Sequence, residues 1–274
     1  MHWIGHPGSL LPIRDRGEES SQADQQVVLS RSLGGTVRAA VSRKRAPRSW
    51  SLSIPSAHWD EVAHVEALLA GTLGPYQLVT ARMQVSNVLT PERSVMTDQA
   101  LGMGGVWEVE GGEWATTVRL NPAAAFSTDA PVTIGPAPTP PVFTARPVTV
   151  SAYLATNATA GAYVTLEWLD AAGAQVGPTI QEDNFVFGMD MLRRSTVTAT
   201  PPAGAVACTL TAHYAEVISM PQVTWTAGPI EWTPGKGVDQ VVVTGFGDST
   251  SIAAPDSRNF RRTSVGIELQ EVGP

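Results

Sequence analysis

The sequence predicts a mostly β protein with one substantial helix. Charged residues make up 16% of its 274 positions, while glycine occurs 25 times and proline 21 times. Many turn-forming residues and few charges are typical of short strands joined by turns. Short stretches of alternating apolar and polar residues recur along the chain, which is the period of a half-buried strand. A chain of this length can form one large domain or two ordinary ones.

The clearest strand of the N-terminal region covers residues 48–54. Trp50, Leu52 and Ile54 fall on one face of it, with serines at the positions between them. Successive side chains of a strand point to opposite faces, so we expect these three residues to lie in the core and the serines to face water.

The other N-terminal elements predict a small sheet with one helix. An amphipathic helix follows Pro55, with Ser56 as its N-cap and Gly71 as the residue that ends it. Four further strands are predicted, at residues 10–13, 26–30, 36–41 and 76–80. The composition changes after Arg82, where the turn-rich segment 87–112 and a proline-rich connector or rigid edge, residues 131–147, follow.

Strands return from Val148 onward, with a spacing that suggests a β-sandwich. The predicted strands are residues 148–154, 163–169 and 206–214. Trp168 shares its face with Val164 and Leu166 and is therefore predicted to be a core residue. The turns that join these strands resemble those of jelly-roll modules of the carbohydrate-binding kind.

Two tyrosines of this region are the candidate ligand-binding residues. Tyr153 and Tyr163 lie on the outward faces of their strands by parity. A flat aromatic ring on a wet face can stack on a pyranose while neighbouring polar groups bond to the sugar hydroxyls. An ordinary surface or a subunit interface is the alternative for both residues.

We expect the C-terminal strands, residues 240–244 and 263–269, to complete the N-terminal sheet as a β-sandwich or barrel with one helix. The chain then holds a discontinuous domain, residues 1–82 and 238–274, and an inserted jelly-roll β-sandwich, residues 83–237. Insertion of a domain at a surface loop is well tolerated.

The two ends of the chain resemble the distal tail or minor tail proteins of siphophages, of the type found in actinobacteriophages. The resemblance is carried by Arg48-Ser-Trp50 on a strand, the helix after it, Gly71-Thr-Leu-Gly74-Pro75, and a closing strand at residues 263–272. It implies a hub protein of the virion tail tip that assembles in the host cytoplasm. It also implies a homo-hexameric ring that contacts the tail tube protein and other tail-tip or baseplate proteins.

Two other functions stay open at this point. The first alternative is a tail protein that binds a host-surface glycan through the inserted sandwich. The second is an accessory binding module of a polysaccharide-degrading system. A flanking catalytic domain, or the absence of tail-gene neighbours, would indicate the second.

Charge gives one further candidate surface. The formal net charge of −7 argues against general affinity for nucleic acid or anionic membranes, because phosphate binding depends on Lys and Arg. Five basic residues nevertheless concentrate near a predicted hairpin tip, namely Arg38, Arg43, Lys44, Arg45 and Arg48. They form either a basic patch for a partner protein or passing DNA, or a solvated turn.

The sequence indicates no enzyme, cofactor or metal site. The nucleophile-elbow, zinc-protease, calcium-loop and dinucleotide motifs are absent. His58 and His64 are six positions apart, which does not place them on one helix face as metal ligands require. Cys208, the single cysteine, shares its face with apolar residues and is predicted to lie in the core. No run of about eighteen apolar residues predicts membrane insertion.

Overall fold

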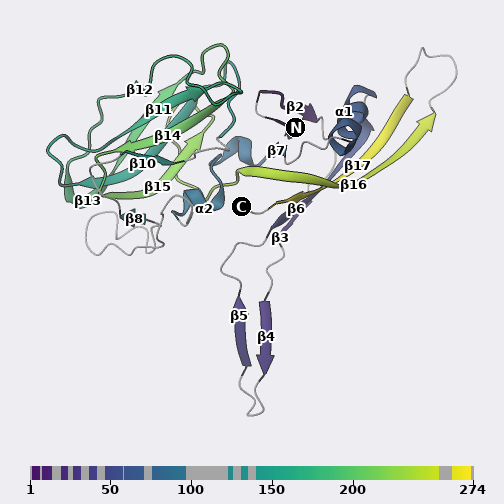
Figure 1. Ribbon diagram of the computed structural model, residues 1–274, viewed down its shortest axis with the longest axis horizontal. Coiled ribbons are helices and arrows are strands. Elements are labelled where there is room, and N and C mark those ends of the chain that lie inside the picture. Colours follow the sequence, from purple (N-terminus) through teal and green to yellow (C-terminus); the bar gives the residue numbers. More distant parts are fainter. Residues whose placement is uncertain are drawn as a thin grey trace. The chain divides into compact units, whose positions relative to one another are not determined.

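The mostly β fold class is confirmed. The computed structural model describes residues 2–6, 8–13, 20–23, 27–31, 37–41, 47–57, 59–70, 76–96, 123–125, 131–134, 140–252 and 261–272. The chain divides into two compact units (Figure 1): unit 1 comprises residues 1–5, 10–78 and 240–274, and unit 2 comprises residues 6–9 and 79–239. From the sequence, the division was predicted at 82/83 and 237/238, with residues 6–9 in the other domain.

Unit 1 is built on one seven-stranded sheet in the order β2-β1-β7-β16-β17-β6-β3. Its elements are β1 (His2–Gly5), β2 (Leu11–Ile13), β3 (Ser20–Ala23), β4 (Val27–Arg31), β5 (Val37–Val41), β6 (Arg48–Ala57), α1 (Trp59–Ala70), β7 (Tyr76–Val79), β16 (Val238–Ile252) and β17 (Arg261–Glu271). The C-terminal strands β16 and β17 thus lie between β7 and β6 and complete the N-terminal sheet. β4 and β5 pair with each other in a sheet of their own.

The core of unit 1 forms where β6 and β17 pair in antiparallel. Trp50 lies opposite Leu269, and Leu52 opposite Ile267. All four side chains are buried, while the serines between them on β6 are exposed. Because opposite residues of an antiparallel pair share a face, the alternation in each strand gives one continuous apolar face.

The helix α1 packs its apolar side against this sheet. Val65 and Leu68 are buried, and the Tyr76 hydroxyl donates a hydrogen bond to the Leu68 carbonyl (2.9 Å). The predicted start of the helix was wrong: Ser56 still belongs to β6, so it does not cap α1, which begins at Trp59. The strand continues because residues 54 and 57 keep their pairing with β17. Gly71 lies outside the described residues.

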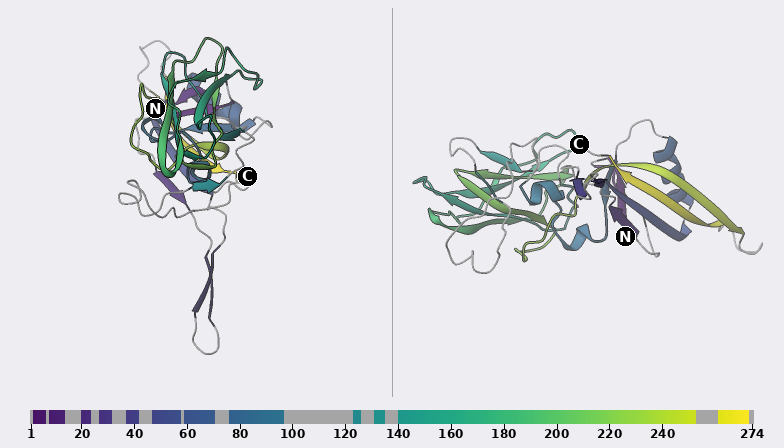
Figure 2. Two further views of the ribbon diagram at one scale, coloured as in Figure 1. Left: turned by 90° about the vertical axis from the view of Figure 1, so that its left-hand side faces the viewer. Right: turned by 90° about the horizontal axis from the view of Figure 1, so that it is seen from below.

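Unit 2 contains two four-stranded sheets in which the described pairings are antiparallel (Figure 2). Its elements are the short helices η1 (Met83–Val85) and α2 (Pro91–Ser94), followed by β8 (Ala123–Ala125), β9 (Val132–Ile134), β10 (Val148–Thr156), β11 (Tyr163–Leu169), β12 (Ile180–Gln181), β13 (Gly188–Ala199), β14 (Ala207–His213) and β15 (Val217–Thr224). The sheet orders are β13-β10-β15-β8 and β12-β11-β14-β9.

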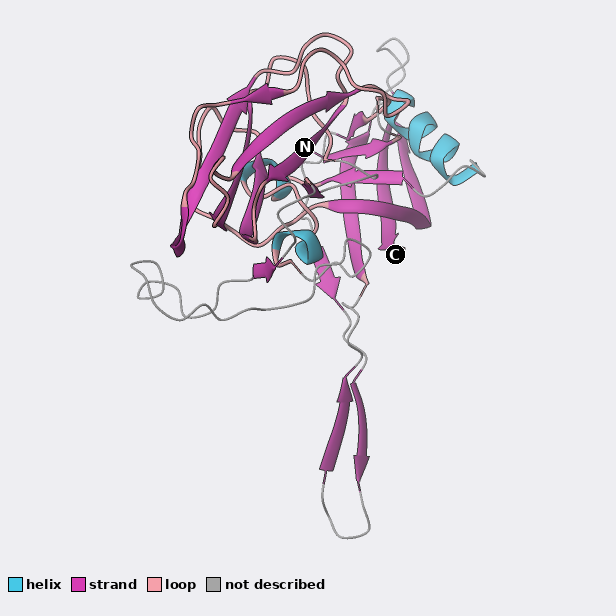
Figure 3. Cartoon of the chain, turned by 60° about the vertical axis from the view of Figure 1, so that its left-hand side comes forward, coloured by secondary structure: helices cyan, strands magenta, loops and turns pink. Residues whose placement is uncertain are grey.

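The two sheets of unit 2 pack face to face over an apolar core (Figure 3). Val150 and Leu154 of β10, Leu166 and Trp168 of β11, and Leu210 of β14 are all almost fully buried. Trp168 is 1% exposed, which agrees with its place in the core by strand parity.

Five strands of unit 2 were not predicted, namely the long strands β13 and β15 and the short strands β8, β9 and β12. β13 and β15 each span eight or more residues. β15 contains Pro221 and is buried at all eight positions, so neither its composition nor any alternation marks it as a strand. β9 lies in the segment predicted as a proline-rich connector and forms the edge of its sheet, as that prediction's rigid-edge alternative allows.

The entry and exit of unit 2 are tied together by one buried side chain. Asn87 is fully buried, and its amide nitrogen donates to the carbonyls of Pro221 (2.9 Å) and Thr233 (3.1 Å). Its amide oxygen accepts from the backbone nitrogens of Leu89 (3.2 Å) and Val223 (3.1 Å). Both donors and both acceptor positions of the carboxamide are therefore used.

Backbone hydrogen bonds add to these contacts of Asn87. Lys236 donates to the Asn87 carbonyl (2.9 Å), and Gly237 donates to the Leu89 carbonyl (2.8 Å). A Cβ atom on Gly237 would lie 2.1 Å from the Val88 carbonyl oxygen, and one on Gly235 would lie 2.2 Å from that of Leu89. At Gly235 and Gly237 the returning backbone therefore lies so close to residues 88 and 89 that no side chain fits, and glycine is required.

We expect Asn87→Ala to lower the free energy of unfolding by about 3–5 kcal/mol, because four buried or part-buried backbone groups each lose a hydrogen bond. Urea denaturation followed by tryptophan fluorescence measures this change. Asn157→Ala is the matched control: Asn157 is exposed, and we expect it to cost less than about 1 kcal/mol. Equal effects of the two substitutions would contradict the role given to Asn87.

Candidate functional site

The two candidate tyrosines lie on different sheets of unit 2. Tyr153 belongs to β10 and Tyr163 to β11, and each is half-buried on the face opposite the shared core. The outer faces of two packed sheets point away from each other. The structure therefore does not bring these residues together in one site.

Tyr153 lies beside a polar cluster. The Arg194 guanidinium lies over its ring at 5.8 Å from the centroid. The same guanidinium donates to the Ser151 hydroxyl (2.9 Å) and to the side-chain oxygen of Gln222 (2.8 Å). Burial lowers the pKa of Arg194 from its ordinary value. The Arg194 cation is therefore bonded within the protein, and Tyr153 is part of the sheet surface.

Tyr163 instead forms the inner member of an aromatic cluster. Its ring stacks on His213, with centroids 4.8 Å apart and an interplanar angle of 10°. Phe185 meets it edge to face at 5.2 Å, and Tyr214 lies 6.1 Å away at a tilt. We call Tyr163, Phe185, Phe187, His213 and Tyr214 the aromatic cluster.

The cluster lies at one end of unit 2, where Tyr163 begins β11, His213 ends β14, and three loops contribute the other members and their supports. These loops connect β10 to β11, β12 to β13 and β14 to β15. Ala162 and Val186 exchange two backbone hydrogen bonds of 2.7 Å, which join the first loop to the second. Gly161 has φ +74°, and a Cβ there would lie 2.7 Å from the Phe187 ring. The positive φ favours glycine at this position, and the Phe187 ring lies close to its backbone.

The outer rings of the cluster are open to solvent. Phe187 is 53% exposed, Tyr214 is 44% exposed and Phe185 is 39% exposed. Tyr214 adopts φ 53°, a conformation that costs free energy for any residue with a side chain. Exposed large aromatic side chains that the fold holds at such a cost are candidates for contact with a ligand.

The cluster changes the titration of its members. Burial lowers the pKa of His213, while the carboxylate of Glu167 acts in the opposite direction. Burial also raises the pKa of Tyr163, with a further contribution from Tyr214. His213 Nε2 and the Thr165 hydroxyl share a hydrogen bond of 3.0 Å. At neutral pH the cluster therefore presents an uncharged His213 imidazole and an uncharged Tyr163 phenol.

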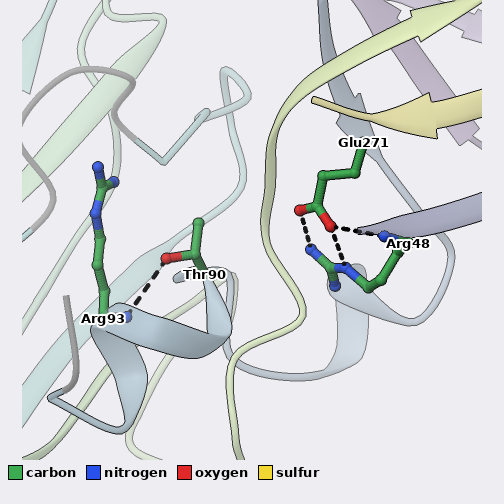
Figure 4. Close-up of polar contacts among 4 residues, drawn as sticks. All are labelled: Arg48, Thr90, Arg93 and Glu271. Carbon is green, nitrogen blue, oxygen red and sulfur yellow. Dashed lines mark hydrogen bonds and ion pairs between the residues drawn. The ribbon is translucent and has the colours of Figure 1, made fainter. Parts of the chain in front are cut away.

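In unit 1, the predicted basic patch loses one member to an ion pair (Figure 4). Arg48 Nη2 and Nε donate to the two carboxylate oxygens of Glu271 at 2.9 and 3.1 Å, and the Arg48 backbone nitrogen adds a third bond of 3.1 Å. The Arg48 guanidinium also lies over the Trp50 ring at 5.2 Å. Arg48 thus joins β6 to the end of β17 and is not a free cation.

The other patch residues lie outside what the structure describes. Arg43, Lys44 and Arg45 belong to an undescribed segment, and for Arg38 only the backbone within β5 is described. The basic patch therefore stays a prediction for these four residues.

Figure 4 also shows the start of α2 in unit 2, where the Thr90 hydroxyl accepts a hydrogen bond from the Arg93 backbone nitrogen (3.4 Å). Thr90 is therefore the N-cap of this short helix, and Pro91 takes the first helical position. This local order holds the segment that follows Asn87.

Within the described residues no group of three His, Cys, Asp or Glu side chains is placed to hold a metal ion. His64 Nε2 lies 3.3 Å from the Ile4 carbonyl oxygen, which binds this histidine to β1. His58 lies outside the described residues. Cys208 is fully buried, and burial raises its pKa to about 12, so its thiol stays protonated. None of the described helices is long and apolar enough to span a membrane.

Comparisons with protein-family models, curated proteins and solved structures found no match to this chain.

Sequence reasoning identified one residue of the aromatic cluster and missed four. Phe185 and Phe187 lie in a loop, where neither helical nor strand periodicity marks an outward side chain. His213 and Tyr214 fell at the end of the predicted strand 206–214, whereas β14 ends at His213 and Tyr214 begins the next loop. The available signal was the Phe-Val-Phe triplet close to a glycine in an otherwise polar segment, residues 181–188.

We expect Glu271→Gln to lower the free energy of unfolding by about 3 kcal/mol, because it leaves the mostly buried Arg48 cation without its counter-ion. The Arg48 and Glu271 side chains are 16% and 6% exposed, so added salt should restore little of the loss. Urea denaturation at low and high salt measures both effects. Glu66→Gln, on the exposed face of α1, is the control and should change stability by less than about 0.5 kcal/mol.

We expect His213 to titrate below the ordinary histidine pKa of about 6.5, as measured by NMR of its ring protons. A folded-state pKa below the unfolded one means that the unfolded chain binds more protons, so His213 lowers stability as the pH falls through about 6.5. Tyr163→Ala should raise the His213 pKa because it uncovers the ring. A pKa that does not change in this variant would contradict burial by Tyr163 as the cause.

Proposed function

We propose that this protein is a structural component of a bacteriophage tail tip, a distal tail (hub) protein whose unit 1 forms a ring between the tail tube and the baseplate or fibre. Its partners are further copies of itself, the tail tube protein and other tail-tip proteins, and its location is the virion after assembly in the host cytoplasm. The proposal starts from the resemblance of the two ends of the chain to that family.

One observation carries the proposal: the two segments that bear the resemblance are direct neighbours in unit 1. β6 and β17 pair from Ser49 opposite Gln270 to Ala57 opposite Thr263. Arg48 and Glu271, which are 223 positions apart, join their ends. A likeness divided between two distant segments has a structural meaning only if they form one domain, and this pairing meets that condition.

Within the described residues, the two edges of the unit 1 sheet support an assembly role. The seven-stranded sheet ends at β2 and β3, which have three and four residues. The edge of a sheet offers unpaired backbone groups to another chain, and a symmetric ring covers such edges. Short edge strands limit indiscriminate pairing, so a specific neighbour is needed to complete them.

Two hairpins give the same indication. In the described part of the chain, β4 and β5 form a sheet of two strands, which alone is marginally stable in water. The β16–β17 hairpin extends to Ile252 opposite Arg261, past the last pairing of β17 with β6 at Thr263. A neighbouring subunit that packs against these hairpins would stabilise both.

The strand order of unit 2 supports an inserted jelly roll. Counted from β8, the eight described strands run 6-3-8-1 in one sheet and 5-4-7-2 in the other. A double-sheet jelly roll made of two Greek keys would have this strand order. Such a module adds a surface to a ring without altering the domain that forms it.

The mass in solution tests the proposal. We expect light scattering of the purified protein to give a closed assembly near six subunits of 28.9 kDa at high concentration. Replacement of residues 27–41 by a Gly-Ser linker should reduce the assembly to monomers while circular dichroism and thermal unfolding stay unchanged. A strict monomer at every concentration and at two salt concentrations, with no ring in electron micrographs, would contradict it.

A further inference from the structure

We propose that the aromatic cluster of unit 2 is a saccharide-binding site that takes a neutral pyranose. This inference goes beyond the tail-tip proposal, which concerns unit 1, and does not depend on it. The ligand class is inferred from three properties of this region: its flat rings, its hydroxyl groups and the charge of its loops.

The size of the exposed aromatic surface fits a sugar. Phe187, Tyr214 and Phe185 are between 39% and 53% exposed. Side chains of about 150–250 Å² each then present on the order of 300 Å² of ring surface, whereas a stable protein interface needs about 800 Å² from each partner. The patch matches one or two pyranose rings better than a protein.

The rings are held in place before any ligand arrives. Tyr163 is fixed between the stacked His213 and the edge of Phe185. Phe187 rests on Gly161, and the Ala162–Val186 bridge holds the two loops together. A ligand that binds to rings already ordered does not have to offset the loss of side-chain entropy.

The polar groups of the cluster suit hydroxyl groups. Tyr163 and Tyr214 each carry a phenol, which can donate and accept a hydrogen bond. Because burial raises the pKa of Tyr163, this phenol stays protonated at neutral pH. Stacking on the apolar face of a pyranose, with hydrogen bonds at its rim, needs this combination of groups.

The charge of the loops argues against an anionic ligand. Residues 157–163, 182–187 and 213–216 contain three acidic side chains and no Lys or Arg. The Glu216 carboxylate already accepts from the Asn157 backbone nitrogen (2.9 Å) and side-chain nitrogen (3.2 Å). A phosphate, sulfate or uronate group would find no Lys or Arg counter-ion in these loops, which favours a neutral sugar as the ligand class.

Affinity electrophoresis of the full-length protein tests this site. The probes are native gels that contain a soluble β-glucan, mannan or galactan, with polygalacturonate as the anionic comparison. We expect at least one neutral polysaccharide to retard the protein and polygalacturonate not to do so. Phe187→Ala should weaken the retarding interaction about tenfold, since a lost aromatic contact of this kind is worth about one power of ten.

Two substitutions at Tyr214 separate stacking from simple apolarity. Tyr214→Phe keeps the flat ring and should keep most of the binding, while Tyr214→Leu keeps an apolar side chain and should lose it. Val85→Ala is the matched control: Val85 is 77% exposed in the same unit but lies outside the cluster, and its loss should leave binding unchanged.

Three results would overturn the proposal. The first is that none of the neutral polysaccharides retards the wild-type protein. The second is that Tyr214→Leu or Phe187→Ala binds as tightly as wild type while thermal unfolding shows both to be folded. The third is that Phe187→Ala lowers the mass of the assembly in light scattering, which would make the cluster a contact between copies of this chain.

Discussion

Unit 1 depends on a pairing between strands near the two ends of the chain. The buried face of β6 is complete only when Val265, Ile267 and Leu269 of β17 lie opposite its own apolar residues. The Arg48–Glu271 ion pair closes this ladder at one end, with three hydrogen bonds to one carboxylate. A shift of one residue would turn every apolar side chain of β17 to the opposite face, so the apolar alternation and the ion pair specify the same register.

This constraint has a consequence for unit 2. Apart from residues 6–9, unit 2 follows β7 and precedes most of β16, and these strands are neighbours in the sheet. The chain must therefore leave and return at nearly the same place. Asn87 and the glycines at 235 and 237 meet that requirement by binding the outgoing and returning segments to each other. Unit 2 is thereby closed by its own contacts, as expected of an inserted domain.

The faces of unit 2 differ in what they leave for a ligand. On the sheet that holds Tyr153, Arg194 is bonded to Ser151 and Gln222, so the polar groups there are satisfied within the protein. In the loops that join the two sheets, Phe187 and Tyr214 are exposed. A rigid sandwich that presents its exposed aromatic residues on loops separates the part that folds from the part that binds.

Local pattern determined the mostly β class, the inward faces of β6 and β11 and the existence of α1, because alternation and helical spacing are properties of neighbouring residues. Several strands were not visible in this way, since β15 is buried on both faces and β9 lies among prolines. The end of β6 was also not visible in its own sequence, because pairing with the distant strand β17 keeps Ser56 in a strand.

The chemistry of individual side chains was decided by the tertiary structure. Arg48 looked like one of five neighbouring cations, and only the return of β17 places Glu271 against it. Tyr153 and Tyr163 looked equivalent by strand parity, yet they lie on separate sheets. Charge, strand parity and composition are properties of the sequence itself, whereas residues that are many positions apart become partners only in the folded chain.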